Sequence, residues 1–143
     1  MIALDTNVVS ELMRDVPHPA VLAWLDTQRS SELYLPSVAM AELLFGVEDL
    51  PQGKRRMALE RTLGTWLEMF AGRVLPLDEA AAYAYAKRAV AARRAGRPLP
   101  VADGYIAAIA AAHGARVATR DVRPYQSAGV EAVNPWEAEA AER

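Results

Sequence analysis

Cysteine is absent from the 143 residues, and histidine is scarce, with only His18 and His113. The absence of cysteine excludes disulfide scaffolds, cysteine-ligated zinc, iron–sulfur clusters and thiol nucleophiles. Two histidines are too few for a three-histidine zinc site. Any bound metal would therefore depend mainly on oxygen ligands.

An excess of positive charge is also missing, because 16 basic residues are set against 18 acidic ones and the formal net charge is −2. This balance differs from that of a protein that binds nucleic acid by charge alone. It leaves room for nucleic-acid chemistry at a site where metal ions supply the positive charge.

Long hydrophobic runs are absent as well. The longest, from Tyr105 to Ala112, is far below the roughly 18 residues that indicate a membrane span. The first residues reach the carboxylate of Asp5 without a basic segment, so no targeting signal is visible. The sequence predicts a soluble, cytoplasmic protein with no membrane partner.

The chain has the length of one domain, and 52% of its residues are hydrophobic, which suffices for a packed core. Short apolar runs typical of strands alternate with segments of helical periodicity. The predicted strands are 2–5, 32–36, 73–77, 116–119 and 130–133, and the predicted helices are 7–13, one starting at 17–19, 37–49, 54–70, 78–95 and 101–113. This alternation predicts an α/β fold with a mostly parallel sheet of four to five strands. Two helices separate the third strand from the fourth, so the path of that crossover stays open.

Two acids follow predicted strands directly. Asp5 comes after Ile2-Ala3-Leu4, and Asp121 comes just past Val117-Ala118-Thr119. Because ligands of parallel α/β sheets bind at the carboxyl ends of the strands, both acids are expected at the functional edge.

Two further acids lie on predicted helices, on faces that are otherwise apolar. Glu42 has Val38 at i−4 and Phe45 at i+3, and Asp103 stands above Ile106 on its helix. This spacing predicts that both side chains point toward the core side. The helix N-terminus adds a favourable positive potential at Asp103.

Alone, Asp5 has an ordinary explanation as a helix cap, Asp103 as a first-turn acid, and Asp121 as a turn residue. Together, four acids reached from one sheet edge are explained more simply by a shared cation, since an unpaired inward carboxylate costs several kcal/mol. Oxygen ligands select Mg²⁺ or Mn²⁺. Such a cluster is suited to the hydrolysis of phosphodiester bonds.

Four short motifs carry a resemblance to a known family. They are Leu4-Asp5-Thr6-Asn7, Ala41-Glu42-Leu43 with Gly46, Ala102-Asp103-Gly104-Tyr105-Ile106-Ala107-Ala108, and Ala118-Thr119-Arg120-Asp121. In this order and at this chain length they resemble the PIN-domain ribonucleases, in particular the VapC/FitB-like toxins of bacterial type II toxin–antitoxin systems. Phe70-Ala71-Gly72-Arg73-Val74-Leu75-Pro76 and Asn134-Pro135-Trp136 also look FitB-like.

The resemblance implies a PIN-like three-layer α/β/α sandwich over residues 1–136, followed by a C-terminal tail, 137–143. It implies RNA cleavage that depends on Mg²⁺ or Mn²⁺, with Asp5, Glu42, Asp103 and Asp121 as catalytic and metal-binding residues. Polar residues that match the surroundings of the metal are Thr6, Asn7 and Thr119. The resemblance also implies a homodimer and a small cognate antitoxin that inhibits the enzyme. The complex would contact operator DNA only through this antitoxin.

Other residues have competing interpretations. Arg93, Arg94 and Arg97 could contact RNA phosphates, although such charge runs are usually solvated helix faces. Large apolar side chains on the helices of so small a domain predict a dimer interface. These are Trp24, Trp66, Phe70, Tyr83 and Tyr85.

Two other classes of function compete with the nuclease. An aspartyl-phosphate phosphatase or receiver also places an aspartate after the first strand, but the phosphatase motif needs an acid where Asn7 stands, and a receiver needs a lysine that Lys54 and Lys87 do not supply from mid-chain helices. A non-enzymatic module that binds a partner or DNA leaves the four acids unexplained. No phosphate-binding loop, dinucleotide fingerprint or serine-hydrolase motif occurs.

Overall fold

The computed structural model describes residues 1–138, so most of the predicted tail, 139–143, lies outside the described residues. Five strands form one sheet in the order β3-β2-β1-β4-β5. They are β1 (Ile2–Leu4), β2 (Leu33–Pro36), β3 (Val74–Leu75), β4 (Arg116–Ala118) and β5 (Ala132–Val133). All four strand pairings are parallel. The predicted α/β fold with a mostly parallel sheet is confirmed.

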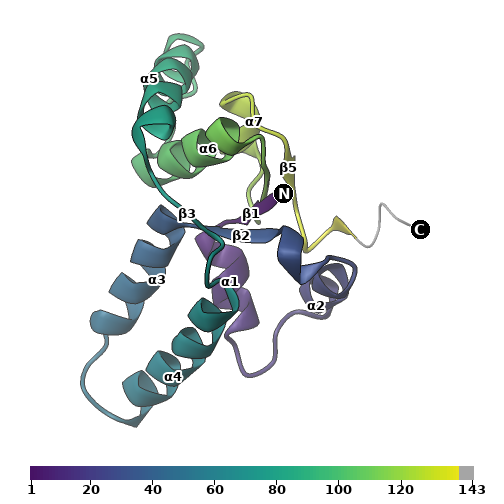
Figure 1. Ribbon diagram of the computed structural model, residues 1–143, viewed down its shortest axis with the longest axis vertical. Coiled ribbons are helices and arrows are strands. Elements are labelled where there is room, and N and C mark those ends of the chain that lie inside the picture. Colours follow the sequence, from purple (N-terminus) through teal and green to yellow (C-terminus); the bar gives the residue numbers. More distant parts are fainter. Residues whose placement is uncertain (139–143) are drawn as a thin grey trace.

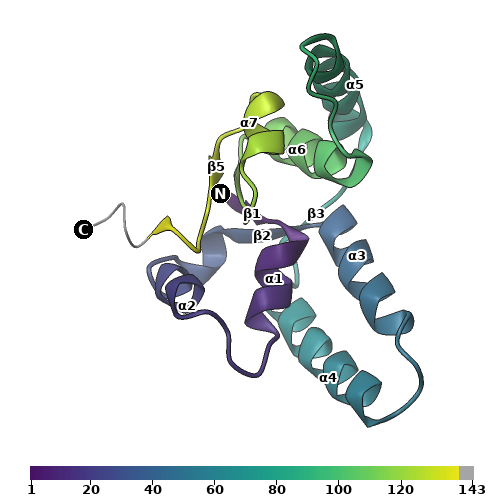
Figure 2. The ribbon, with the colours of Figure 1, turned by 180° about the vertical axis from the view of Figure 1, so that it is seen from behind.

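Helices cover both faces of this sheet, which gives the three predicted layers (Figures 1 and 2). One side carries α5 (Glu79–Arg94), α6 (Val101–His113) and α7 (Arg123–Ser127). The other side carries α1 (Thr6–Leu12), α2 (Pro19–Asp26) and α4 (Lys54–Met69). The 3-10 turn η1 (Ser30–Glu32) leads into β2, and α3 (Ser37–Glu48) continues from its end and packs against α4.

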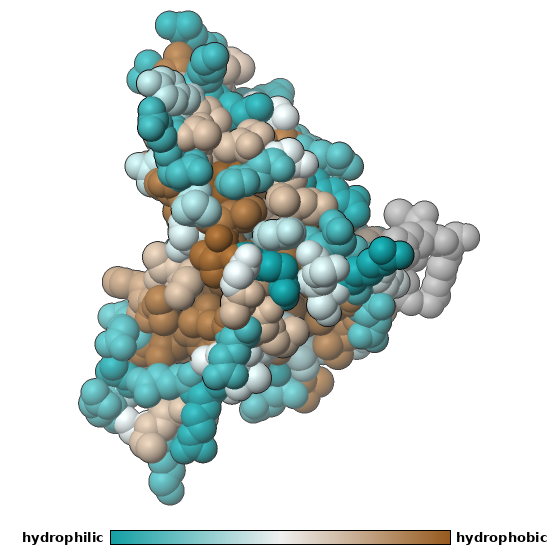
Figure 3. All heavy atoms as spheres, in the orientation of Figure 1, coloured by the Kyte–Doolittle hydropathy of each residue, from teal (hydrophilic) through white to brown (hydrophobic). Residues whose placement is uncertain are grey.

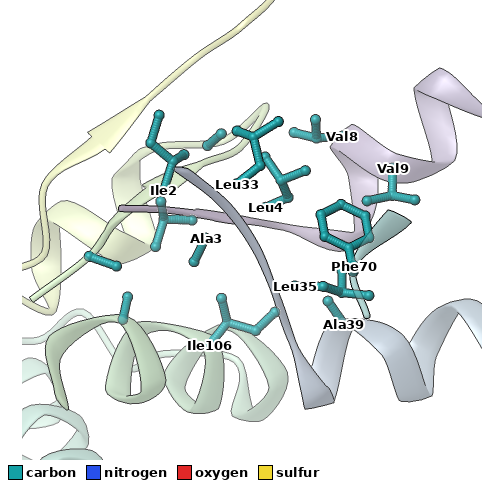
Figure 4. Packing of buried hydrophobic residues seen from close by; sticks show 14 of the residues in the cluster. Ile2, Ala3, Leu4, Val8, Val9, Leu33, Leu35, Ala39, Phe70 and Ile106 are labelled. Atoms are coloured by element: carbon teal, nitrogen blue, oxygen red, sulfur yellow. The ribbon is translucent and has the colours of Figure 1, made fainter. Parts of the chain in front are cut away.

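The hydrophobic core follows the strand period of two. Figure 4 shows Ala3 on the side of the sheet where Ile106 of α6 lies, and Leu4 on the side of Val8 in α1. Leu4, Leu35 and Ile106 are fully buried. Complete burial of such side chains contributes about 1.5–3 kcal/mol each. The core therefore clamps α1 and α6 to opposite faces of the central strands.

The crossover between β3 and β4 is a pair of helices, and α6 packs on β2 and β4. The second helix, α5, packs against α6, and the rings of Tyr85 and Tyr105 lie 4.6 Å apart between them. A Cβ atom at Gly104 would lie 2.9 Å from Cε2 of Tyr85, so the close approach of the two helices requires glycine there. This answers the question that the helical periodicity left open.

No helix within residues 1–138 is long and apolar enough to cross a membrane.

Candidate functional site

Asp5 and Thr119 meet because their strands are neighbours. In the register of β1 and β4, Leu4 pairs with Ala118, so the residues that follow emerge side by side at the carboxyl edge of the sheet. The hydroxyl of Thr119 donates a hydrogen bond of 2.8 Å to Oδ2 of Asp5. The sequence prediction that Asp5 lies at this edge is correct.

The Asp5 carboxylate is the most constrained acid of the site. It is only 6% exposed, and its Oδ1 accepts a 2.7 Å hydrogen bond from the backbone N–H of Thr6 at the start of α1. Its Oδ2 accepts from Thr119 and also, at 2.8 Å, from the hydroxyl of Tyr125. Three donors therefore hold this carboxylate in one orientation.

Tyr125 lies on α7, a helix that the sequence analysis did not predict. The signal for it was the Arg123-Pro124 pair, because proline favours the first position of a helix. Burial, followed by the negative charge of Asp5, raises the pKa of the Tyr125 hydroxyl well above its ordinary value. The hydroxyl therefore stays protonated and acts as a donor to Asp5.

Glu42 differs from its prediction. It lies on α3 as expected, but its side chain is exposed and does not point into the core. Its Oε1 accepts a 2.7 Å hydrogen bond from the hydroxyl of Thr6, and Phe45 on the same helix is 69% exposed. Glu42 lines surface cavities on α3, which explains why an acid is tolerated there.

Asp103 stands in the first turn of α6 and is half-buried. Burial raises the pKa of its carboxyl group, and the negative charges of Asp5, Glu42 and Asp121 raise it further. These influences place Asp103 within the electrostatic reach of the other three acids. The structure thus brings the four predicted acids into one region.

Asp121 is the outermost of the four. Its Oδ1 lies 3.1 Å from Nε of Arg123 in an ion pair, and both side chains are largely exposed. Hydrogen bonds from Arg123 lower the pKa of the Asp121 carboxyl group. The backbone N–H of Asp121 lies 3.3 Å from the hydroxyl oxygen of Thr119, so Thr119 connects this acid to Asp5.

A cavity of about 670 Å³ opens at this edge of the sheet. Three of the four predicted acids line it, together with Asn7, whose Oδ1 accepts a hydrogen bond from the backbone N–H of Arg120. Sequence reasoning missed several other side chains that line the cavity. They are Ser10, Glu11, Arg14, Arg120 and Trp136.

The donors suit a hard cation by chemical type, because they are carboxylate, amide and hydroxyl oxygens. Within residues 1–138, however, no three acidic or histidine side chains already form a metal-binding group. Glu42 is hydrogen-bonded to Thr6, and Asp121 is paired with Arg123. Like charges repel at short range, so without a cation these carboxylates are expected to take separate partners. The residues fit a divalent cation in charge and ligand type.

Arg93, Arg94 and Arg97 are exposed and do not line the cavity. Arg93 and Arg94 occupy the last turn of α5, the end of the helix that projects away from the sheet in Figures 1 and 2. Their contact with RNA stays a prediction.

In buffer with a chelator, Asp103→Asn is expected to melt about 2–5 °C above the parent protein at pH 7.5. The raised pKa of Asp103 means that the folded state binds this proton more tightly than the unfolded state does. The parent therefore loses stability as the pH rises from the ordinary aspartate range through the raised pKa, and the asparagine variant does not. Melting curves from pH 3.5 to 7.5 test this.

The difference between Asp103→Asn and the parent should shrink at the acid end, where Asp103 is protonated in both states. Glu131→Gln, at an exposed position outside the helices, is the control and should follow the parent at each pH. A constant offset between the Asp103 variant and the parent at all pH values would contradict the prediction.

Comparisons with known proteins agree with this fold. The PIN domain family matches residues 2–130. The chain is 50% identical to the VapC ribonuclease Y4jK of Sinorhizobium fredii, over 96% of this chain and 99% of that protein. It is 45% identical to the toxin FitB of Neisseria gonorrhoeae, over 95% of this chain and 99% of that protein.

The fold is shared with solved structures as well. The crystal structure of FitAcB from Neisseria gonorrhoeae superposes with a TM-score of 0.90 at 44% identity, over 95% of this chain and 99% of that one. Both the family match and these relatives span nearly all of the described residues. The chain therefore belongs to the PIN-domain family, as its four motifs predict.

Proposed function

We propose that this protein is a metal-dependent endoribonuclease that acts as the toxin of a toxin–antitoxin pair. The observation that carries the proposal is the acid-lined cavity at the carboxyl edge of a PIN-domain sheet, where Asp5, Glu42 and Asp103 meet. Relatives named as a VapC ribonuclease and as the toxin FitB support the same activity. The substrate is RNA and the reaction is hydrolysis of its phosphodiester bonds.

Asp5, Glu42, Asp103 and Asp121 are the proposed ligands of Mg²⁺ or Mn²⁺. When bound, such a cation polarises a phosphate and lowers the pKa of water. The contribution of the chain is to hold the carboxylates. Thr119 and Tyr125 orient Asp5, Thr6 orients Glu42, and the N-terminus of α6 favours the charge of Asp103.

Purified protein should cleave single-stranded or structured RNA in Mg²⁺ or Mn²⁺ and lose that activity in excess EDTA, regaining it when the cation is restored. The reason is that four carboxylates without a cation repel the anionic substrate. Sequencing the 5′ ends of cellular RNA after induced expression would locate the cuts. Cleavage that persists undiminished in EDTA would contradict metal dependence.

The competing aspartyl-phosphate chemistry lacks support at this site. The phosphatase motif needs a second acid where Asn7 stands, and Asn7 lines the cavity beside Asp5. No lysine lines the cavity within the described residues. The nuclease remains the better supported function.

The surface proposed to bind the antitoxin is a groove of this protein that leads into the acid site. A second cavity, of about 710 Å³, lies between α1, α3 and α4, and Thr6, Ser10, Arg14 and Glu42 line both cavities. Its apolar walls include Met13, Leu43, Val47 and Leu59. Phe45, although it lies on α3, is not part of these walls.

The antitoxin segment is proposed to lie in this groove and to place an arginine or lysine at the acids. Burial of apolar side chains supplies most of the affinity for a segment that orders on binding. The basic side chain pairs with two carboxylates and excludes the cation. Operator DNA is contacted only through the N-terminal part of the antitoxin. Structural neighbours of this chain include complexes of FitAB and VapBC with DNA.

The homodimer remains a proposal, but it now rests on an exposed apolar patch and not on aromatic residues that the domain cannot bury. Trp24 and Phe70 lie in the core, so the expectation that the domain could not bury them is wrong, whereas Tyr83 is 68% exposed. Figure 3 shows apolar side chains gathered over β3 and α3, where Val74, Leu44 and Phe45 are exposed. An apolar patch of this kind favours a partner surface.

Light scattering at micromolar concentration is expected to give twice the mass of one chain. Phe45→Asp should shift the measured mass toward that of one chain, because it places a charge in the apolar patch. The control is Met57→Asp, which adds the same charge at an exposed position of α4. A parent that scatters as a monomer across micromolar concentrations would refute the homodimer.

A further inference from the structure

Arg120 and Trp136 form a stacked pair at the rim of the acid-lined cavity. The guanidinium carbon of Arg120 lies 5.1 Å from the centre of the Trp136 ring, and both side chains line the cavity with Asp5 and Asp103. The two residues follow the neighbouring strands β4 and β5, so the sheet itself brings them together. Trp136 is half-buried and Arg120 is exposed.

Hydrogen bonds fix the backbone beneath this pair. The N–H of Arg120 donates to Oδ1 of Asn7 at 3.2 Å, and its carbonyl oxygen accepts from Nδ2 of Asn134 at 3.1 Å. The Oδ1 of Asn134 in turn accepts from the N–H of Trp136 at 2.9 Å. These bonds therefore fix the backbone of Arg120, and that of Trp136, whose ring supports the guanidinium, in position beside the acids.

The head group of Arg120 is available to a ligand, unlike the other arginine of the cavity. Arg14 pairs with the buried Glu11 at 3.2 Å. Within residues 1–138, Arg120 has no carboxylate within ion-pair distance, even though acids line the same cavity. A cation supported by a ring and left without an anionic partner is suited to bind an anion from solution.

A phosphate is the anion that fits this position. A planar guanidinium binds phosphate through two parallel hydrogen bonds. A polyanion that enters an acid-lined cavity also needs a positive group to offset repulsion by the carboxylates. Arg120 and the acids line the same cavity. An RNA phosphate bound to Arg120 would therefore be a neighbour, along the RNA, of the phosphate bound at the acids.

We propose that Arg120 binds an RNA phosphate next to the scissile one, and that Trp136 is a positioning residue that holds the guanidinium for this contact. The assignment rests on the proposed ribonuclease function and adds a substrate contact to it. It makes the segment after β5 part of the substrate site, although none of the four acids comes from that segment.

The test measures RNA binding without cleavage. In the Asp5→Asn background, which is not expected to cleave RNA, fluorescence polarisation follows a labelled single-stranded RNA from 50 to 300 mM salt with Mg²⁺ present. Arg120→Gln should weaken binding about tenfold and reduce the slope of log K against log salt by about one, as expected for one lost phosphate contact. Arg120→Lys should keep the salt slope and lose part of the affinity. Arg29→Gln, at an exposed position before η1, is the control for net charge.

A double-mutant cycle separates positioning from a structural role. Trp136→Leu should weaken binding in the parent and have little further effect once Arg120 is glutamine, whereas Trp136→Phe keeps a ring and should bind like the parent. Melting temperatures verify that each variant folds. Arg120→Gln with the affinity and salt slope of the Arg29 control would overturn the proposal while leaving the ribonuclease function standing. A parent that neither binds nor cuts RNA would overturn both.

Discussion

Asp5→Asn is expected to reduce RNA cleavage at least about 100-fold and to leave the protein folded. The carboxylate is nearly buried and receives hydrogen bonds from Thr6, Thr119 and Tyr125. Asparagine has the same shape, and the two hydroxyl groups can rotate to accept from its amide. The fold is therefore kept, while the charge that a divalent cation needs is removed.

Two measurements check this result. Cleavage of a labelled RNA in Mn²⁺ gives the loss of activity, with Asp49→Asn as a control that removes an exposed carboxylate outside both cavities. The melting temperature of the parent should rise with Mn²⁺, because a ligand of the folded state stabilises it by mass action, and that of Asp5→Asn should rise much less. Full activity of Asp5→Asn in Mn²⁺ would show that Asp5 is not a metal ligand.

Gly46→Phe is expected to weaken antitoxin binding roughly 100-fold, which corresponds to about 2.7 kcal/mol. Gly46 lines the groove between α1, α3 and α4, and a Cβ atom there meets no other atom within 4 Å. A phenyl ring at this position would occupy the space proposed for apolar side chains of the antitoxin. The helix should tolerate the change, because glycine is a poorer helix former than phenylalanine.

The matched control is Gly64→Phe. Gly64 also lies within a helix, α4, with open space around its Cβ position, but it does not line the groove. Titration calorimetry with the cognate antitoxin, together with melting temperatures of both variants, compares the two. Equal affinity of the two variants for the antitoxin would place the antitoxin on another surface.

Local sequence patterns predicted the position of an acid where that position is set by a single strand or helix. Asp5 follows an apolar strand, and Asp103 stands in the first turn of a helix with a clear apolar stripe. The same reasoning pointed Glu42 toward the core side, whereas its side chain is exposed, because helical periodicity shows which residues share a face and not what that face contacts. On α3 that face borders a groove.

Local sequence patterns did not predict contacts between segments that are distant in the chain. Tyr125 meets Asp5 across 120 positions in the chain, and no local feature of either residue indicates the pair. The stack of Arg120 on Trp136 likewise depends on the pairing of β4 with β5. The short strand β5 has only two residues, so its register carries almost no sequence signal.

The amino-acid sequence was sufficient for the class of fold and the family, because strand and helix periods and short motifs are local properties of the chain. The arrangement of the acids was settled only by folding. The strand register sets Asp5 beside Thr119. Packing of α6 on the sheet partly buries Asp103 and brings it near the other acids, and burial first and their charges second raise its pKa. Distances between side chains on different elements follow from register and packing, which no single segment of the sequence contains.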